Sequence, residues 1–117
     1  MREIQFYRNV SVDCPVEEFL DELNPKQVQK VVWVLKLVKE LPLVPRQYLK
    51  KLEGTDDLWE VRAEFGGDAF RLLGFWDAGN LIVLTNGSAK KSQKIPEREL
   101  ALAAQRKRDY LNRKAKR

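Results

Sequence analysis

Apolar and polar residues alternate along two segments in the middle of the chain. The first segment runs from Trp59 to Phe65 and the second from Phe70 to Trp76, with Gly66-Gly67 between them. Alternation with a period of two is typical of β-strands, and a glycine pair between two such segments is typical of a tight hairpin turn. The apolar run over residues 81–85 predicts a third strand, so these segments together form an antiparallel meander.

Three prolines mark the starts of predicted helices. Pro15 opens a segment with apolar residues at helical spacing, which predicts a helix over residues 15–23. Pro25 opens a second, longer segment that continues toward Pro42, so the two helices form a hairpin with almost no loop. Pro96, followed by acidic residues that complement the helix dipole, predicts a final helix.

The remaining segments complete the order of elements. Ile4 and Phe6 alternate with polar neighbours and predict a short first strand over residues 2–8. Residues 42–58 contain two prolines and a glycine and are expected to form an irregular connector. The order βααβββα predicts an α+β fold, with the helices on one face of a small antiparallel sheet. A chain of 117 residues is expected to form a single domain, residues 1–117.

The composition excludes several classes of chemistry. The chain contains no histidine and a single cysteine, Cys14. Histidine is the usual general base near neutral pH and the commonest metal ligand, so pairs such as Ser-His and most zinc or iron sites are excluded. No glycine-rich phosphate loop is present, and the carboxylates lack the spacing of metal ligands. We therefore expect neither a metal nor another cofactor.

Positive charge is concentrated near the C-terminus. The formal net charge is +5, yet residues 1–85 carry 11 basic and 14 acidic side chains, whereas residues 86–117 carry 11 basic and 3 acidic ones. Concentrated cationic charge attracts polyanions such as nucleic acids. Residues 111–117 are expected to be a frayed basic tail. The longest apolar run is too short to cross a membrane, so we expect a soluble cytoplasmic protein.

The glycine turn also predicts which residues of the hairpin pair. A two-residue loop at Gly66-Gly67 places Arg62 opposite Arg71 on one face of the sheet. Like charges in this position repel, so the pair needs nearby carboxylates or an anionic ligand. The sequence leaves both interpretations open: Glu60 and Glu64 satisfy the arginines as a surface network, or the arginines bind an anion.

Several lysines flank the same part of the predicted sheet. Lys50 and Lys51 precede the strand with Arg62, and Lys90, Lys91 and Lys94 follow the last strand. If these segments converge, they form a basic concavity suited to a phosphodiester backbone. A lysine pair alone is common on protein surfaces and has little specificity.

A combination of motifs resembles a known family. The residues Leu58-Trp59-Glu60-Val61-Arg62, then Phe70-Arg71-Leu72, then Lys90-Lys91-Ser92-Gln93-Lys94-Ile95-Pro96 are similar to those of the RelE/ParE toxin superfamily, in its phage-derived, HigB-type branch. The resemblance covers nearly the whole chain. It implies the toxin of a type II toxin–antitoxin system, neutralised by a small antitoxin, often a helix-turn-helix protein.

The resemblance also implies an activity and its residues. RelE-like toxins enter the ribosome and cleave mRNA without a metal, using the 2′-OH of the mRNA as the nucleophile. By motif, Arg62, Arg71, Lys90 and Lys91 would form the catalytic site, and Lys50, Lys51 and Lys94 would bind RNA.

One departure from the family pattern keeps a second interpretation open. Relatives in this branch often have histidine before the glycine at the end of the last strand, where this chain has Asn86. The alternative is a non-catalytic relative, either a ParE-like inhibitor of DNA gyrase or a degenerate protein that binds an antitoxin. Generic nucleic-acid binding through the basic C-terminal segment is a third interpretation.

Overall fold

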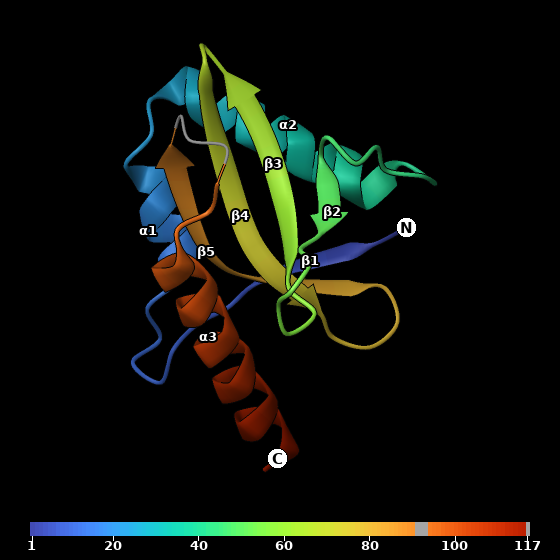
Figure 1. Ribbon diagram of the computed structural model, residues 1–117, viewed down its shortest axis with the longest axis vertical. Helices are drawn as coiled ribbons and strands as arrows, with labels where there is room; N and C mark the ends of the chain where they lie inside the picture. The colour runs from blue at the N-terminus through green and yellow to red at the C-terminus, as the bar shows by residue number, and fades with distance from the viewer. Residues whose placement is uncertain (91–93, 117) are drawn as a thin grey trace.

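The computed structural model describes residues 1–90 and 94–116, which form one five-stranded sheet and three helices (Figure 1). This arrangement confirms the predicted α+β class. In chain order the elements are β1 (Glu3–Phe6), α1 (Pro15–Asp21), α2 (Pro25–Glu40), β2 (Leu49–Lys51), β3 (Trp59–Phe65), β4 (Asp68–Trp76), β5 (Leu81–Lys90) and α3 (Glu97–Ala115). No helix within the described ranges is long and apolar enough to cross a membrane.

The sheet is mixed, whereas a wholly antiparallel sheet was expected. Its strand order is β1-β5-β4-β3-β2, and β1 runs parallel to β5 while all other neighbours are antiparallel. Tight turns join β3, β4 and β5 and force antiparallel pairing. The helical hairpin separates β1 from the meander, so β1 is free to join it in the parallel direction.

Strand β2 lies within the segment that was expected to be irregular. Its three residues pair with β3, with Leu49 opposite Val61 and Lys50 opposite Glu60. Three residues are too few for a recognisable alternation of polar and apolar positions, so periodicity does not predict this strand.

The β3–β4 hairpin has the predicted register. Gly66 and Gly67 both adopt positive φ, +61° and +87°, as a turn with two left-handed positions requires. Arg62 is therefore paired with Arg71, and Glu60 with Leu73.

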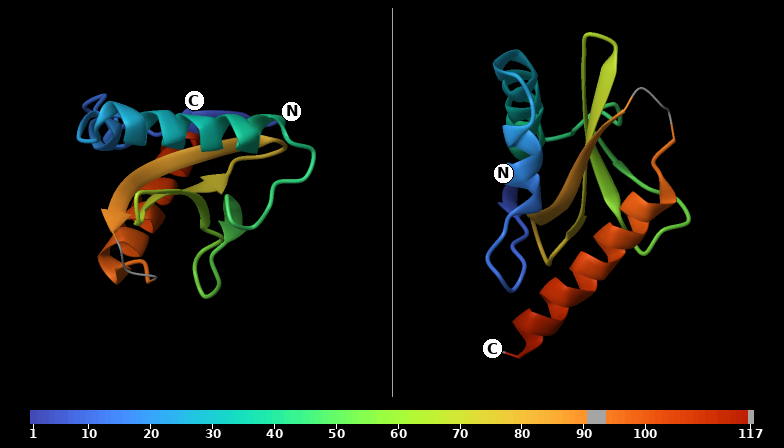
Figure 2. Two further views of the ribbon diagram at one scale, coloured as in Figure 1. Left: turned by 90° about the horizontal axis from the view of Figure 1, so that it is seen from above. Right: turned by 90° about the vertical axis from the view of Figure 1, so that its left-hand side faces the viewer.

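Helices α1 and α2 cover one face of the sheet (Figure 2). The start of α2 is fixed by a capping box, in which Asn24 and Gln27 each accept a hydrogen bond from the other residue's backbone N–H. Apolar residues of α1 and α2 pack against the strand residues that point to this side, namely Val16, Phe19, Val31, Val34 and Val38 against Val61, Ala63, Phe70, Leu72, Ile82 and Leu84.

Helix α3 lies on the opposite face of the sheet, contrary to the expectation that all helices share one face (Figure 2). Ala103 of α3 is fully buried in a cluster with Leu58 and Leu73, and Tyr110 packs edge-on against Phe75. Leu73 and Phe75 alternate with the residues that face the hairpin, so β4 is apolar on both faces. A strand of this kind needs cover on both sides, which α3 provides.

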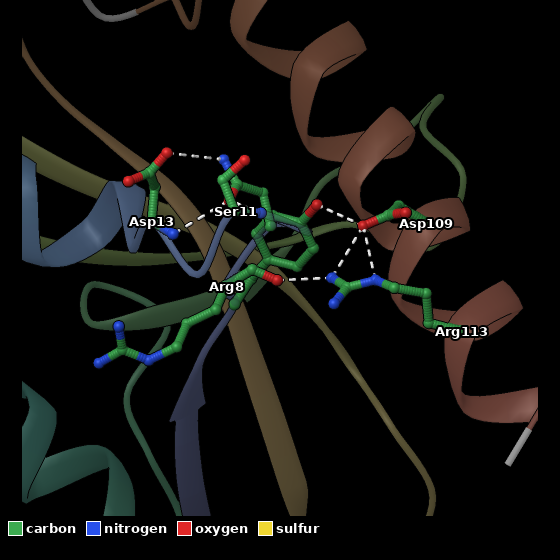
Figure 3. A network of polar contacts seen from close by, with 7 residues as sticks. Arg8, Ser11, Asp13, Asp109 and Arg113 are labelled. Carbon is green, nitrogen blue, oxygen red and sulfur yellow. Dashed lines mark hydrogen bonds and ion pairs between the residues drawn. The ribbon is translucent and has the colours of Figure 1, made fainter.

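The last turns of α3 are anchored to the sheet. Residues 111–115, which were expected to be part of a frayed tail, continue the helix. Tyr110 and Lys114 both donate to the carboxylate of Asp77. Tyr7 donates to the carboxylate of Asp109. Arg113 also donates to Asp109 (Figure 3). Hydrogen bonds from Lys114 and Tyr110 lower the pKa of Asp77, and the hydrogen bond from Tyr7 lowers that of Asp109.

A β-bulge in β5 divides the strand into two parts. Leu73 pairs with Asn86 and Gly74 with Leu84, so Thr85 is the extra residue. The bulge turns Leu84 toward the helical hairpin and Asn86 toward α3. Gly74 makes this close approach possible, because a Cβ atom there would lie 2.1 Å from the carbonyl oxygen of Val83.

The anchoring of α3 predicts an acid-sensitive contribution from Asp77. Its folded-state pKa is below its unfolded value, so its contribution is complete above about pH 4 and is lost as the pH falls through the folded-state pKa. We expect Asp77→Asn to lower the free energy of unfolding by about 1–3 kcal/mol at pH 7. Urea unfolding should show this difference shrinking between pH 6 and pH 2.5, whereas a constant difference would contradict the assignment.

Candidate functional site

Cationic side chains from four segments line a cavity of about 250 Å³ on the face of the sheet that α3 covers. Lys50 comes from β2, Arg62 from β3, Arg71 from β4, and Lys94 from the segment before α3. Glu60 of β3 lies among them. We call this cavity the arginine cleft; its other lining residues are Leu52, Glu53, Thr55, Ile95 and Leu100.

Arg71 and Glu60 form a buried ion pair in the arginine cleft. The Nε atom of Arg71 lies 3.1 Å from Oε2 of Glu60, and the side chains are 3% and 2% exposed. Burying two charges costs several kcal/mol of desolvation for each ion, which their attraction offsets only in good geometry. The pair therefore holds the Arg71 guanidinium in a fixed direction inside the protein.

Arg62 lies directly across from Arg71 and is less buried. Its Nη2 atom is 3.2 Å from Oε1 of Glu64, whose side chain is largely exposed. Each arginine thus has a carboxylate partner, as one interpretation of the sequence expected. The network reaches the surface only at Arg62 and Glu64, because the Arg71–Glu60 pair is buried.

Both guanidinium groups retain hydrogen-bonding capacity. Nη2 of Arg71 and Nε of Arg62 are buried and have no hydrogen-bond partner within the described part of the chain. A buried donor without a partner costs about 1–3 kcal/mol. An anion bound between the two arginines would provide acceptors for both donors, which makes the cleft a candidate oxyanion site.

The charge balance of the arginine cleft also favours an anion. Four cationic side chains and two carboxylates, Glu53 and Glu60, line it. Leu52, Ile95 and Leu100 form an apolar part of the wall, which lowers the local dielectric constant and strengthens the field of the cations. The arrangement is suited to holding a phosphate and to stabilising additional negative charge on it.

The structure brings together four of the seven site residues predicted from the sequence: Lys50, Arg62, Arg71 and Lys94. Lys51 is not among the lining residues. It follows Lys50 in the strand, so its side chain points to the other face, where its Nζ lies 3.1 Å from Oδ1 of Asp57. Lys90 ends β5 opposite Ala69, and Lys91 lies outside the described residues.

Asn86 does not line the arginine cleft, although it is diagonal to Arg71 across β4 and β5. Its side-chain oxygen accepts a hydrogen bond from Thr85, and its amide nitrogen lies 3.3 Å from acceptor oxygens of Glu99. Leu73 lies between Glu60 and Asn86 in the paired register. Asn86 instead lines a separate cavity of about 500 Å³ between α1, β5 and α3. In this structure the residue joins β5 to α3.

Glu60 is the functional residue that sequence reasoning placed least well. It was considered as a surface partner of the arginines. In the structure it is 2% exposed and lines the cleft. The signal for its burial was its position opposite Leu73, an apolar residue of a strand that is covered on both faces.

The buried ion pair predicts unequal effects of two carboxylate substitutions. Glu60→Gln leaves a buried arginine without a charged partner, so we expect the free energy of unfolding to fall by about 3 kcal/mol. Glu64→Gln, at an exposed position, should change it by less than about 0.5 kcal/mol. Urea unfolding measures both, and equal small effects would contradict the role given to the pair. The double variant Glu60→Leu/Arg71→Met should recover most of the lost stability.

Comparisons with known proteins identify the family of the chain. One solved structure with a matching fold is described as the "Crystal structure of archaeal RelE-RelB complex from Pyrococcus horikoshii OT3". The match has a TM-score of 0.50 and 17% sequence identity, and covers 80% of this chain and 98% of that one. At this identity the match establishes a shared fold. No curated protein sequence matches the chain. The family model for phage-derived Gp49-like proteins (DUF891) matches residues 18–108, and the chain therefore belongs to the Gp49-like family.

Proposed function

We propose that this protein is the toxin of a type II toxin–antitoxin system, a HigB-type member of the RelE/ParE superfamily that cleaves mRNA on the ribosome. The observation that carries the proposal is the pair of adjacent arginines, each with an unpaired buried donor, in a cationic cleft. The shared fold with a RelE chain supports it.

The proposed reaction needs positioning and charge stabilisation from the protein. The 2′-oxygen of a nucleotide attacks the adjacent phosphorus, forming a cyclic phosphate as the bond to the 5′-oxygen of the next nucleotide breaks. Negative charge accumulates on the non-bridging oxygens in the transition state. Arg62 and Arg71 are placed to donate to those oxygens, and such donors act most strongly when they are held in advance. A base accepts the proton of the 2′-OH, and an acid donates a proton to the departing 5′-oxygen, so the products are a 2′,3′-cyclic phosphate and a free 5′-hydroxyl.

The remaining cations of the site have supporting roles in this proposal. Lys50 and Lys94 line the cleft and would contact the RNA backbone. Lys90 and Lys91, at and beyond the end of β5, would add to the same contacts, and Lys51 would bind RNA further from the reacting phosphate. No histidine takes part, because the chain has none.

The proposal includes a protein partner. The related structure is a complex of RelE with RelB, which supports the expectation that this chain also binds a small antitoxin. The ribosome and its mRNA would be the targets of the free toxin.

A second candidate function is binding without catalysis, as in a ParE-like gyrase inhibitor or a degenerate antitoxin-binding protein. Two observations favour it. Asn86 stands where relatives often have histidine, and Glu60 already occupies one side of Arg71. Growth arrest with intact message and damaged DNA would identify the gyrase inhibitor, and no effect on growth would identify the degenerate protein.

Substitution of the arginines tests the proposed cleavage. In a reconstituted translation reaction we expect Arg62→Ala and Arg71→Ala each to slow cleavage of ribosome-bound message by about 100-fold or more, the usual cost of removing one transition-state donor. Lys26→Ala, at an exposed lysine in the first turn of α2, is the matched control and should stay within about threefold of the wild type, since its charge lies outside the cleft. Circular dichroism checks that each variant is folded.

Two outcomes would overturn the cleavage proposal. One is cleavage of bare RNA as fast as ribosome-bound message. The other is undiminished cleavage by folded Arg62→Ala, whose partly exposed side chain makes it the variant less sensitive to misfolding.

Asn86→His tests whether the missing imidazole limits the reaction. We expect the cleavage rate to stay within about threefold of the wild type, because the side chain at position 86 lines a separate cavity and not the arginine cleft. A large increase in rate would show that a base at position 86 reaches the reacting phosphate after all.

A further inference from the structure

Strand β1 forms an edge of the sheet, and alternate backbone groups along it point away from β5. The N–H groups of Glu3 and Tyr7 donate to Asn80 and Leu84, which places the odd-numbered positions on the β5 side. Ile4 and Phe6 therefore direct their N–H and C=O groups outward. Arg2 is even-numbered as well, so its N–H also points outward. It donates to the carbonyl oxygen of Lys39 at the end of α2, so α2 covers the first part of the β1 edge.

An apolar groove of about 370 Å³ runs beside this edge, between β1 and the helical hairpin. Ile4 and Phe6 form its floor, and Leu20, Val32 and Leu35 form its helical wall. Val32 is 50% exposed, although the neighbouring Val31 is buried. An unpaired strand edge beside an apolar groove is the combination that receives an added β-strand, with the backbone supplying hydrogen bonds and the groove accepting alternate side chains.

Cations lie on both sides of the edge. Lys36 and Lys39, with Glu40, line the apolar groove on the helical side. On the other face of β1, Gln5, Tyr110, Arg113 and Lys114 line a second cavity of about 370 Å³. Arg8 also borders this cavity, but its guanidinium points away from Arg113 and bonds to Glu17 of α1, while its carbonyl oxygen accepts a hydrogen bond from Arg113 (Figure 3). Arg8, Arg113 and Lys114 also contact Glu17, Asp109 and Asp77, whereas Lys36 and Lys39 form no ion pair within the described residues. A strand added here would meet an apolar groove with a basic rim on one face and cations on the other.

We infer that the β1 edge is a docking site for an extended segment of a partner chain in which apolar residues alternate with acidic ones. The apolar residues would enter the groove, and the acidic residues, on the opposite face of the added strand, would face Arg113 and Lys114. A second copy of this chain fits less well, because edge-to-edge pairing would bring the cations beside the two β1 strands together. The antitoxin would supply this extended segment, so the inference rests on the proposed function.

Binding of synthetic peptides tests the inference directly. The probe is a fluorescein-labelled seven-residue peptide in which valine alternates with glutamate, and the control peptide has lysine in place of each glutamate. We expect saturable binding of the glutamate peptide to the full chain by fluorescence anisotropy, and binding of the lysine peptide that is at least tenfold weaker. Two further peptides carry N-methyl groups on either the valines or the glutamates. One of these should lose binding and the other retain it, since only alternate N–H groups of an added strand face β1.

Variants and amide exchange locate the bound peptide. Val32→Glu, which puts a charge into the apolar groove at a half-exposed position, should weaken binding of the glutamate peptide by about threefold or more, while Lys26→Glu, at an exposed lysine at the start of the same helix, should not change it. Hydrogen exchange at the amides of Ile4 and Phe6 should slow at least tenfold on binding. The amides of Glu3 and Tyr7, already bonded within the sheet, serve as internal references.

Three results would overturn the inference. They are the absence of saturable binding, equal binding of both N-methylated peptides, and protection of amides elsewhere than β1. Concentration-dependent dimerisation that protects Ile4 and Phe6 without peptide would assign the edge to a second copy instead. None of these readouts involves RNA or toxicity, so the docking site and the proposed cleavage activity fail or succeed separately.

Discussion

The buried ion pair between Arg71 and Glu60 is the constraint on which the arrangement of the site depends. Two charges taken out of water must remain paired, since either one alone would destabilise the fold by several kcal/mol. The pair is diagonal across the β3–β4 hairpin, so it is compatible with one register only. The same register places Arg62 beside Arg71. The register of the hairpin thus places the two positive charges of Arg62 and Arg71 side by side. The negative charge of Glu60, paired with Arg71, offsets their repulsion.

The rest of the fold supports this hairpin from both sides. Ala63, Phe70 and Leu72 alternate with the arginines and pack against α1 and α2. This packing fixes β3 and β4 on the face of the sheet opposite the cleft. On the cleft side, Leu73 packs against α3, and Leu100 and Ile95 form a wall beside the charged groups. The carboxylate of Asp77 anchors the far end of α3 through Tyr110 and Lys114. The cleft therefore lies on elements that are fixed at several points.

The sequence predicted the parts of this arrangement that depend on local chemistry. The glycine pair at 66–67 and the alternation on either side were sufficient to place Arg62 opposite Arg71. Pro15 and Pro25 marked the starts of the helical hairpin. The face occupied by α3 was predicted incorrectly, although Leu73 and Phe75 already made β4 apolar on both sides. The bulge at Thr85 and the three-residue strand β2 depend on contacts between distant segments, which periodicity does not report.

The same limits applied to single side chains in the site. Lys50 and Lys51 are adjacent in sequence and looked equivalent, yet the pleat of β2 sends only Lys50 into the cleft. Asn86 attracted attention because relatives often have histidine there. In the structure Asn86 joins β5 to α3 and lines a separate cavity, which a linear sequence does not reveal.

If Arg62 and Arg71 form one binding site for a phosphodiester, both guanidinium groups should respond to the same ligand. The most direct measurement is NMR of the arginine Nε–H groups during titration with an RNA dinucleotide whose reacting 2′-OH is replaced by hydrogen. We expect saturable shifts at Arg62 and Arg71 with one shared dissociation constant, and little change at Arg98, an exposed arginine beside Glu99. Uniform weak shifts at all arginines, or shifts at Arg62 that leave Arg71 unaffected, would contradict this expectation.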